Sequence, residues 1–176
     1  LIFQTQRAQE NYRDLADVNG LPWYQSIKHI NVGSSSGFLS LGGSFRPRME
    51  YFDNRFWTEN DQSYYTQRLS FHADLQLGER VRFFGELYHG YRSDETLPPN
   101  SDELDWHQGF VEITPLADGQ NTLALRFGRQ EASLGAGRLV DLRDGPNMRR
   151  SFDSGSLNFS RGSLNITAWF GKEVGL

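Results

Sequence analysis

The sequence predicts an all-β fold, an antiparallel up-and-down β-barrel that crosses a membrane with its strands. Three observations lead to this prediction. Apolar and polar residues alternate with a period of two in many short segments, and the connections between these segments are alternately short and long. Aromatic residues make up 14% of a chain whose mean hydropathy is only -0.62. A membrane barrel combines these properties because only every second residue of its strands faces lipid.

The composition argues against several other classes of protein. The hydrophobic fraction is 37%, below the ~45–50% usual for soluble globular domains, yet the aromatic content argues against disorder. No run of about 18 apolar residues is present, so a transmembrane helix is not expected. The chain has no cysteine, which excludes disulfides, thiolate metal sites and cysteine nucleophiles. A net charge of -4 argues against a nucleic-acid partner.

Seven segments carry the alternation that is typical of strands. In residues 68–77, for example, Leu69, Phe71 and Leu75 alternate with polar residues that include Arg68 and Asp74. The predicted strands are residues 45–51, 68–77, 80–91, 108–113, 122–130, 156–160 and 164–170.

The connections alternate in length along the chain. Residues 77–80, 116–121 and 161–163 are short, whereas residues 53–63, 93–103 and 131–150 are long and polar. Outer-membrane barrels have short turns on the periplasmic side and longer loops outside. Aromatic residues also gather near strand ends, as an interfacial girdle requires; they are Tyr51, Phe52, Phe56, Trp57, Tyr64 and Tyr65.

A closed barrel of this kind has an even number of strands, because an open edge is not tolerated in lipid. We therefore predict that the chain forms about seven strands of a larger barrel. Alternation alone also fits a soluble β-sandwich with one wet face. A soluble sandwich or a non-transporting barrel, used for adhesion or assembly, is the alternative that the sequence leaves open.

A family resemblance is carried mainly by residues 125–153. Residues 128–130 read Gly-Arg-Gln at the end of a predicted strand, residues 135–139 read Gly-Ala-Gly-Arg-Leu in a loop, and residues 150–153 read Arg-Ser-Phe-Asp at the next strand start. Together with weaker agreement across residues 22–169, this pattern resembles the alginate export family. The first hairpin, residues 69–80, contributes to the likeness.

The resemblance implies a Gram-negative outer-membrane barrel of about eighteen strands that passes an anionic polysaccharide through an arginine-lined pore. It does not specify alginate as the cargo. On this basis residues 1–36 are a periplasmic N-terminal lead-in, and residues 37–176 are the N-terminal part of the barrel. The expected partners are outer-membrane lipid, an anionic polysaccharide or small anionic solute, and periplasmic export proteins. No cofactor is expected.

The polar faces of the strands would line the lumen. Arginine supplies 16 of the 18 basic residues, and its guanidinium binds carboxylates bidentately while keeping its charge. Rows of arginine would offer a polyanion many weak sites, although the same charges could instead form structural ion-pair ladders. The predicted pore-lining residues are Arg46, Arg48, Glu50, Arg68, Asp74, Arg82, Glu86, Glu112, Arg126, Gln130, Arg138, Arg149 and Arg150.

Catalytic and metal sites are not expected from the sequence. His72, His89 and His107 are not spaced as metal ligands along the chain. Ser70, His72 and Asp74 share one strand face, but every second residue of a strand is ~7 Å apart, too far for a hydrogen-bonded triad. The protein is therefore not predicted to be an enzyme.

The long connection at residues 131–150 has an unusual composition for a solvated loop. Its apolar residues need burial, and its arginines need water or carboxylates; these residues are Leu134, Leu139, Val140, Leu142, Arg138, Arg143, Arg149 and Arg150. A loop folded into the barrel would meet both needs, and Gly135, Gly137 and Gly145 would permit its turns. An external loop with a short local core is the alternative.

Overall fold

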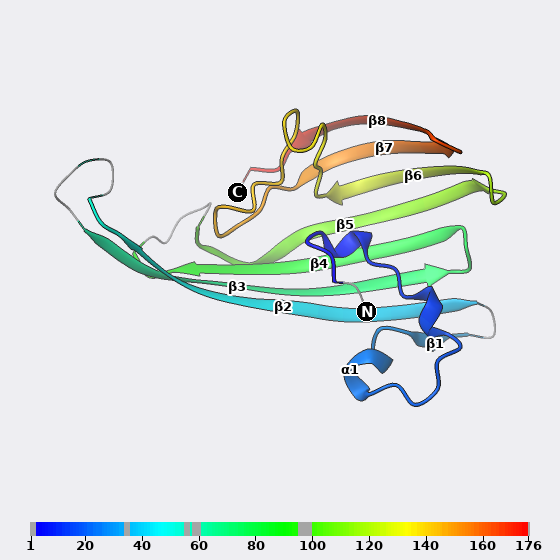
Figure 1. Cartoon of the computed structure of the whole chain (residues 1–176), viewed down its shortest axis with the longest axis horizontal. Coiled ribbons are helices and arrows are strands. Elements are labelled where there is room, and N and C mark those ends of the chain that lie inside the picture. The colour runs from blue at the N-terminus through cyan, green and yellow to red at the C-terminus, as the bar shows by residue number, and fades with distance from the viewer. Residues whose placement is uncertain (1–2, 34–35, 55–56, 58–60, 95–99, 176) are drawn as a thin grey trace.

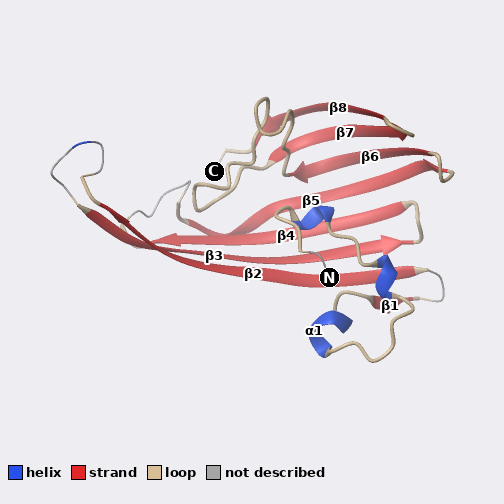
Figure 2. Cartoon of the chain, in the orientation of Figure 1, coloured by secondary structure: helices blue, strands red, loops and turns tan. Residues whose placement is uncertain are grey.

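A computed structural model describes residues 3–33, 36–54, 57, 61–94 and 100–175. In these residues all the strands form one antiparallel eight-stranded sheet in chain order (Figures 1 and 2). The strands are β1 (Ile30–Val32), β2 (Gly37–Phe52), β3 (Gln62–Leu77), β4 (Val81–Arg92), β5 (Asp102–Ala117), β6 (Asn121–Gln130), β7 (Phe152–Arg161) and β8 (Leu164–Glu173). The helical segments are η1 (Arg7–Gln9), η2 (Arg13–Leu15) and α1 (Trp23–Ser26).

The all-β, up-and-down prediction is confirmed, and the seven predicted strands correspond to β2–β8. The sheet is not closed, since β1 and β8 form its two edges. β6, β7 and β8 each have 10 residues, which matches the ~9–11 residues that a tilted transmembrane strand needs. The short strand β1 was not predicted; it pairs with only the first residues of β2, from Ile30 opposite Leu39 to Val32 opposite Gly37.

The turns at one end of the sheet are tight, as predicted. They join β3 to β4, β5 to β6 and β7 to β8, and each contains a glycine in the left-handed region: Gly78 at φ 63°, Gly119 at φ 83° and Gly162 at φ 57°. Glycine adopts this conformation without the steric cost that a Cβ would bring. The long connections all lie at the opposite end, so the expected alternation by side is confirmed.

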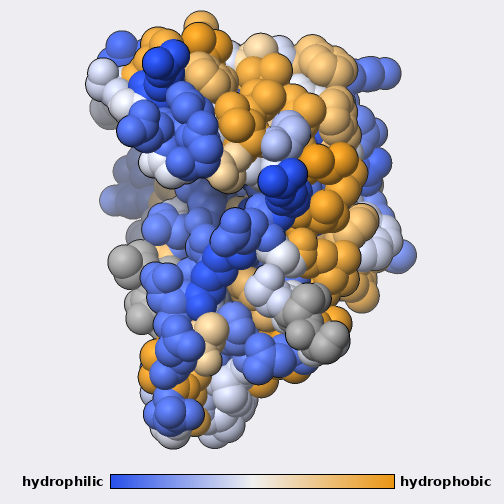
Figure 3. Space-filling model, turned by 90° about the vertical axis from the view of Figure 1, so that its right-hand side faces the viewer, coloured by the Kyte–Doolittle hydropathy of each residue, from blue (hydrophilic) through white to orange (hydrophobic). Residues whose placement is uncertain are grey.

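The apolar face of the sheet is exposed and its polar face is buried, the reverse of the arrangement in a soluble protein. On β3, Leu69 and Phe71 are 47% and 56% exposed, whereas the alternate residues Ser70, His72 and Asp74 are at most 4% exposed. In Figure 3 hydrophobic side chains gather mainly along one side of the molecule, and hydrophilic side chains cover most of the other. No second sheet covers the apolar face within the described residues. A soluble sandwich would need such a sheet, so the arrangement is that of a barrel wall.

Two segments outside the main sheet bury its polar face. Residues 3–15, which include η1 and η2, lie against β4, β5 and the turn after β3, and the connection between β6 and β7 folds back over the same side (Figure 1). Ala8 from the first segment packs with Phe84 and Phe110 in a small apolar cluster. The polar face is therefore covered by the chain's own residues rather than by a second layer of strands.

The aromatic girdle differs in part from the prediction. Tyr51 is 67% exposed and Trp57 is 99% exposed, but Tyr64 is buried at 8% and stacks on Phe52. Tyr64 occupies a polar-face position of β3, so its ring points into the hollow. Phe56 lies outside the described residues.

An arginine on the apolar face should destabilise the barrel. We expect Phe71→Arg to lower the free energy of unfolding by about 2–4 kcal/mol if the residue lies near the bilayer midplane. Leu116→Arg, near the end of β5, should cost only about 0–1 kcal/mol because charges near the interface remain hydrated. Denaturant unfolding in lipid vesicles measures both values. Equal costs at the two positions would contradict the membrane orientation.

Candidate functional site

A ladder of ion pairs crosses the polar face in the half of the sheet nearer the tight turns. Strand register places Arg82 opposite Glu112 and Glu112 opposite Arg126. Arg82 donates two hydrogen bonds to Asp74, at 2.8 Å and 2.9 Å, and its guanidinium lies 3.9 Å from Glu112. Arg126 donates to Glu112 at 2.8 Å and its guanidinium lies 4.2 Å from the Phe110 ring centroid. Both arginines therefore pair with carboxylates of their own wall.

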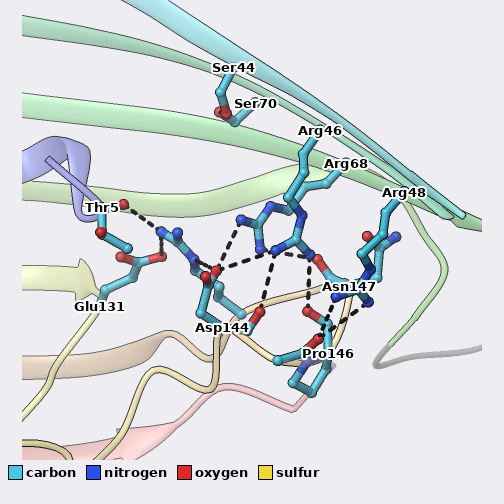
Figure 4. Close-up of polar contacts among 12 residues, drawn as sticks. Thr5, Ser44, Arg46, Arg48, Arg68, Ser70, Glu131, Asp144, Pro146 and Asn147 are labelled. Atoms are coloured by element: carbon cyan, nitrogen blue, oxygen red, sulfur yellow. Dashed lines mark hydrogen bonds and ion pairs between the residues drawn. The ribbon is translucent and has the colours of Figure 1, made fainter. Parts of the chain in front are cut away.

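A second group of arginines lies nearer the long loops. Arg46 and Arg48 on β2 and Arg68 on β3 point toward the β6–β7 connection, which contributes Asp144 and Arg149 (Figure 4). These five residues are called the arginine cluster below. Asp144 Oδ1 lies 2.7 Å from Arg149 Nε, 3.0 Å from Arg68 Nη2 and 3.7 Å from Arg46 Nη1. One carboxylate therefore links three guanidiniums.

The ionisation of Asp144 follows from these contacts. Partial burial of the carboxyl works against its charge, but the hydrogen bonds and positive charges of Arg149 and Arg68 outweigh it and lower the pKa of Asp144 below its ordinary value of 3.8. Asp144 is thus a carboxylate at neutral pH. It remains able to hold the cluster together over the whole physiological range.

The β6–β7 connection is fixed to the sheet by Asn147, whose side chain is fully buried at 0% exposure. Its Nδ2 donates to the backbone carbonyls of Gln67 at 2.8 Å, Asn100 at 2.8 Å and Tyr91 at 3.2 Å. Arg68 donates to the Asn147 carbonyl at 3.3 Å. The connection therefore lies on the polar side of β3 and β4, in agreement with the inward-folding hypothesis.

The apolar residues of this connection do not all behave as expected. Leu142 is buried at 8%, and Met148, which the sequence analysis did not single out, is buried at 3%. Leu139 was expected to need burial, but it is 81% exposed. It lies in the short loop closed by the bridge between Leu134 and Val140, where Gly135 and Gly137 have positive φ. This loop is too tight to turn every side chain inward.

The remaining predicted site residues have diverse environments. Glu50 pairs with Arg48 at 2.8 Å, and Arg150 pairs with Glu173 on β8 at 2.8 Å, away from the cluster. Gln130 is buried and donates to the Ser154 carbonyl at 3.3 Å. Arg138 is exposed in the small loop. Glu86 is almost fully buried and accepts from Gln108 at 2.6 Å.

The N-terminal segment contributes buried polar groups that sequence reasoning did not place in the hollow. Glu10 and Lys28 are 4% and 6% exposed. Burial raises the pKa of Glu10, but hydrogen bonds from Arg7 and Tyr12 more than compensate and lower it. Burial lowers the pKa of Lys28. The Thr5 carbonyl accepts a hydrogen bond from Arg149 at 2.8 Å, which joins this segment to the arginine cluster (Figure 4).

The family model described as alginate export matches residues 38–171. The chain belongs to the alginate export family. At the family level it is therefore part of an outer-membrane β-barrel associated with transport, and the resemblance seen in the sequence is confirmed. Neither the comparison with curated proteins nor the comparison with solved structures found a match. Within the described residues, no helix is long and apolar enough to span a bilayer.

In this alginate export family protein, the ion pairs of Asp144 hold the β6–β7 connection against the arginines of β2 and β3. We expect Asp144→Asn to loosen the β6–β7 connection and to increase its cleavage by an added protease by roughly 5- to 10-fold, because charged hydrogen bonds contribute about 1.5–3 kcal/mol when buried and less when half exposed. Asp141→Asn, an exposed neighbour in the same connection, is the matched control. Limited proteolysis of folded protein measures the effect.

The pH dependence of this docking has a defined sign. Because the folded pKa of Asp144 is lowered, its stabilising effect is present above 3.8 and is lost as the pH falls through the lowered value. Cleavage of the unsubstituted protein should therefore stay constant between about pH 5 and 8. A connection that cleaves equally fast in the D144N and unsubstituted proteins would show that Asp144 does not hold it.

Proposed function

We propose that the polar face lines a channel in the Gram-negative outer membrane, and that anionic polysaccharide or other anionic solutes pass through it. The family supports an outer-membrane channel related to alginate export. The arginine-lined wall and the anionic cargo are the further steps of the proposal. Transport rather than catalysis is the activity assigned to this wall.

The observation that carries the proposal is the partial exposure of the Arg46 and Arg48 guanidiniums. Their side chains are 28% and 32% exposed, whereas those of Arg68 and Arg149 are 6% and 7% exposed. Arg46 reaches the carbonyls of Asp144 and Pro146 at 3.4 Å, and Arg48 reaches the Gly145 carbonyl at 3.4 Å. These long hydrogen bonds are weak. Arg48 also pairs with Glu50 at 2.8 Å, but both guanidiniums keep exposed surface at which a carboxylate in the lumen can compete.

The sequence left two roles open for the arginines, weak binding of a polyanion and structural ion-pair ladders. Each of the two groups of arginines fits one of these roles. Arg82 and Arg126 have short bonds to Asp74 and Glu112, which suits a structural ladder. Arg46 and Arg48 keep exposed charge, which suits repeated weak binding of a polyanion. Arg68 and Arg149 hold Asp144 and so support the exposed pair.

The proposal also says which end of the sheet faces the periplasm and which faces the outside of the cell. Tight turns face the periplasm and long loops face outward in this class of barrel. α1 and β1 lie near the tight-turn end in Figure 1, which supports residues 1–36 as a periplasmic lead-in and a place for export partners. The exposed apolar side chains of β3 and its neighbours would contact outer-membrane lipid.

A non-transporting barrel remains the second candidate, and one observation favours it. The N-terminal segment and the β6–β7 connection fill much of the polar face, since Ala8, Glu10 and Asn147 are all at most 4% exposed. A wall covered in this way could serve assembly instead of passage. Conductance separates the two candidates, because a non-transporting barrel gives no solute-selective current.

Neutralising the exposed pair should reduce anion preference. A unit charge changes the energy of an ion ~4 Å away by about 1 kcal/mol in water, so Arg46→Gln with Arg48→Gln should lower the anion-to-cation permeability ratio roughly five-fold or more. The effect should shrink in 1 M salt, where the Debye length falls to about 3 Å. Reversal potentials in a planar bilayer under a salt gradient measure the ratio.

The matched control is Arg161→Gln at the opposite end of the sheet, where Arg161 is the last residue of β7. It should leave the ratio unchanged. An unaltered reversal potential in the double variant would assign Arg46 and Arg48 to structure and would remove the basis for the anionic cargo.

A further inference from the structure

Three buried side chains from separate elements converge outside the arginine cluster. Glu86 lies on β4, His107 on β5 and Glu131 directly after β6. They are 1%, 4% and 6% exposed, and one potential ligand atom from each lies within 4.8 Å of the other two. The sequence did not predict this group, because its members are separated by more than twenty residues and meet only in the folded sheet.

A β-bulge directs His107 into the group. The pairing of β4 with β5 passes from Glu86 opposite Gln108 to Leu87 opposite Trp106, so His107 is the extra residue. As a result His107 and Gln108 are both buried, although neighbouring residues of a regular strand face opposite sides. Bulges of this kind redirect side chains and are common beside functional sites.

The group has unmet capacity for a cation. Glu86 Oε1 and Glu131 Oε2 are buried and have no hydrogen-bond partner among the described residues. Glu131 Oε1 accepts hydrogen bonds from His107 Nε2 at 2.9 Å and from Arg149 at 3.3 Å. Two adjacent carboxylates that are removed from water need positive charge to offset the loss of hydration, and the single charge of Arg149 is shared with Asp144.

Neighbouring residues hold the three groups in position. Gln108 donates to Glu86 Oε2 at 2.6 Å, and its own Oε1 accepts from the Glu131 backbone N–H at 3.0 Å. The Tyr88 ring stacks on the His107 imidazole, with centroids 3.9 Å apart and planes 11° apart. Metal ligands are typically oriented by such outer contacts.

We propose that Glu86, His107 and Glu131 bind one divalent transition-metal ion of the Zn²⁺ type. A neutral imidazole and two carboxylates form a three-ligand set with room for a further ligand. The imidazole nitrogen disfavours Ca²⁺ and Mg²⁺, which prefer oxygen ligands. The ion would tie the start of the β6–β7 connection to β4 and β5, whether or not the protein transports anionic solutes.

Equilibrium dialysis of the untagged, metal-stripped protein in detergent against ZnCl₂ tests the site directly. We expect one Zn²⁺ per chain bound to this site, a higher thermal midpoint in the presence of Zn²⁺, and weaker binding at lower pH because protons compete with the metal ion for its ligands. CaCl₂ and MgCl₂ at equal concentration should give neither binding nor a shift. The absence of saturable Zn²⁺ binding would overturn the proposal. Arg149 and a proton shared between the two carboxylates would then neutralise Glu86 and Glu131 without a metal ion.

Variants assign the bound ion to these residues. Glu86→Gln, His107→Gln and Glu131→Gln should each weaken binding at least tenfold, and Gln108→Ala should weaken it roughly 10- to 100-fold through loss of orientation. His72→Gln and Glu10→Gln are matched controls, since His72 is buried on the polar face, Glu10 is buried in the N-terminal segment, and neither belongs to the group. Circular dichroism verifies that each variant is folded. Undiminished binding in folded Glu86 and His107 variants would place the ion elsewhere and refute the site.

Discussion

The alternation of side chains across each antiparallel strand is the constraint on which this structure depends. It leaves Leu69, Phe71 and Phe83 on the outer face and places Ser70, His72 and Asp74 in the hollow. A slip of one residue between strands would exchange the two faces completely. The register is continuous over most of β2 to β8, and the bulge at His107 is one of the few places where the pattern is interrupted. Both the apolar surface and the polar wall follow from this single geometric property.

Charged residues in a hollow need partners of opposite charge, and the protein supplies these partners in two ways. The strands satisfy part of this need among themselves, through Asp74, Arg82, Glu112 and Arg126. The β6–β7 connection satisfies another part by bringing Asp144, together with its neighbour Arg149, to Arg46 and Arg68 in a distant part of the chain. Around Glu86 and Glu131, in contrast, one buried oxygen of each carboxylate has no hydrogen-bond partner among the residues that the structure describes. The proposed cargo site and the proposed metal site thus both lie where the protein's own groups neutralise the charges of the hollow only in part.

The strands and turns could be predicted because their signals are local. Period-two alternation marks a strand, and a glycine between two such segments marks a tight turn, so β3, β4 and their connection at Gly78 were accessible from the sequence. The family resemblance added the barrel context. Contacts across long separations could not be predicted: Arg68 and Asp144 are 76 residues apart, and Arg149 and Thr5 are 144 apart. The exposure of Leu139 and the redirection of His107 depend on loop and bulge geometry, which hydropathy does not encode.

The central claim is that the apolar face meets lipid and the polar face lies inside the barrel. Since the chain contains no cysteine, single cysteines can be introduced at each position from 68 to 75 of β3, labelled with a fluorophore and measured in vesicles that contain a lipid-bound quencher. Quenching should occur at positions 69, 71, 73 and 75 and be weak at the positions between them. Equal quenching at all eight positions, or quenching that peaks at positions 68, 70, 72 and 74, would contradict the account.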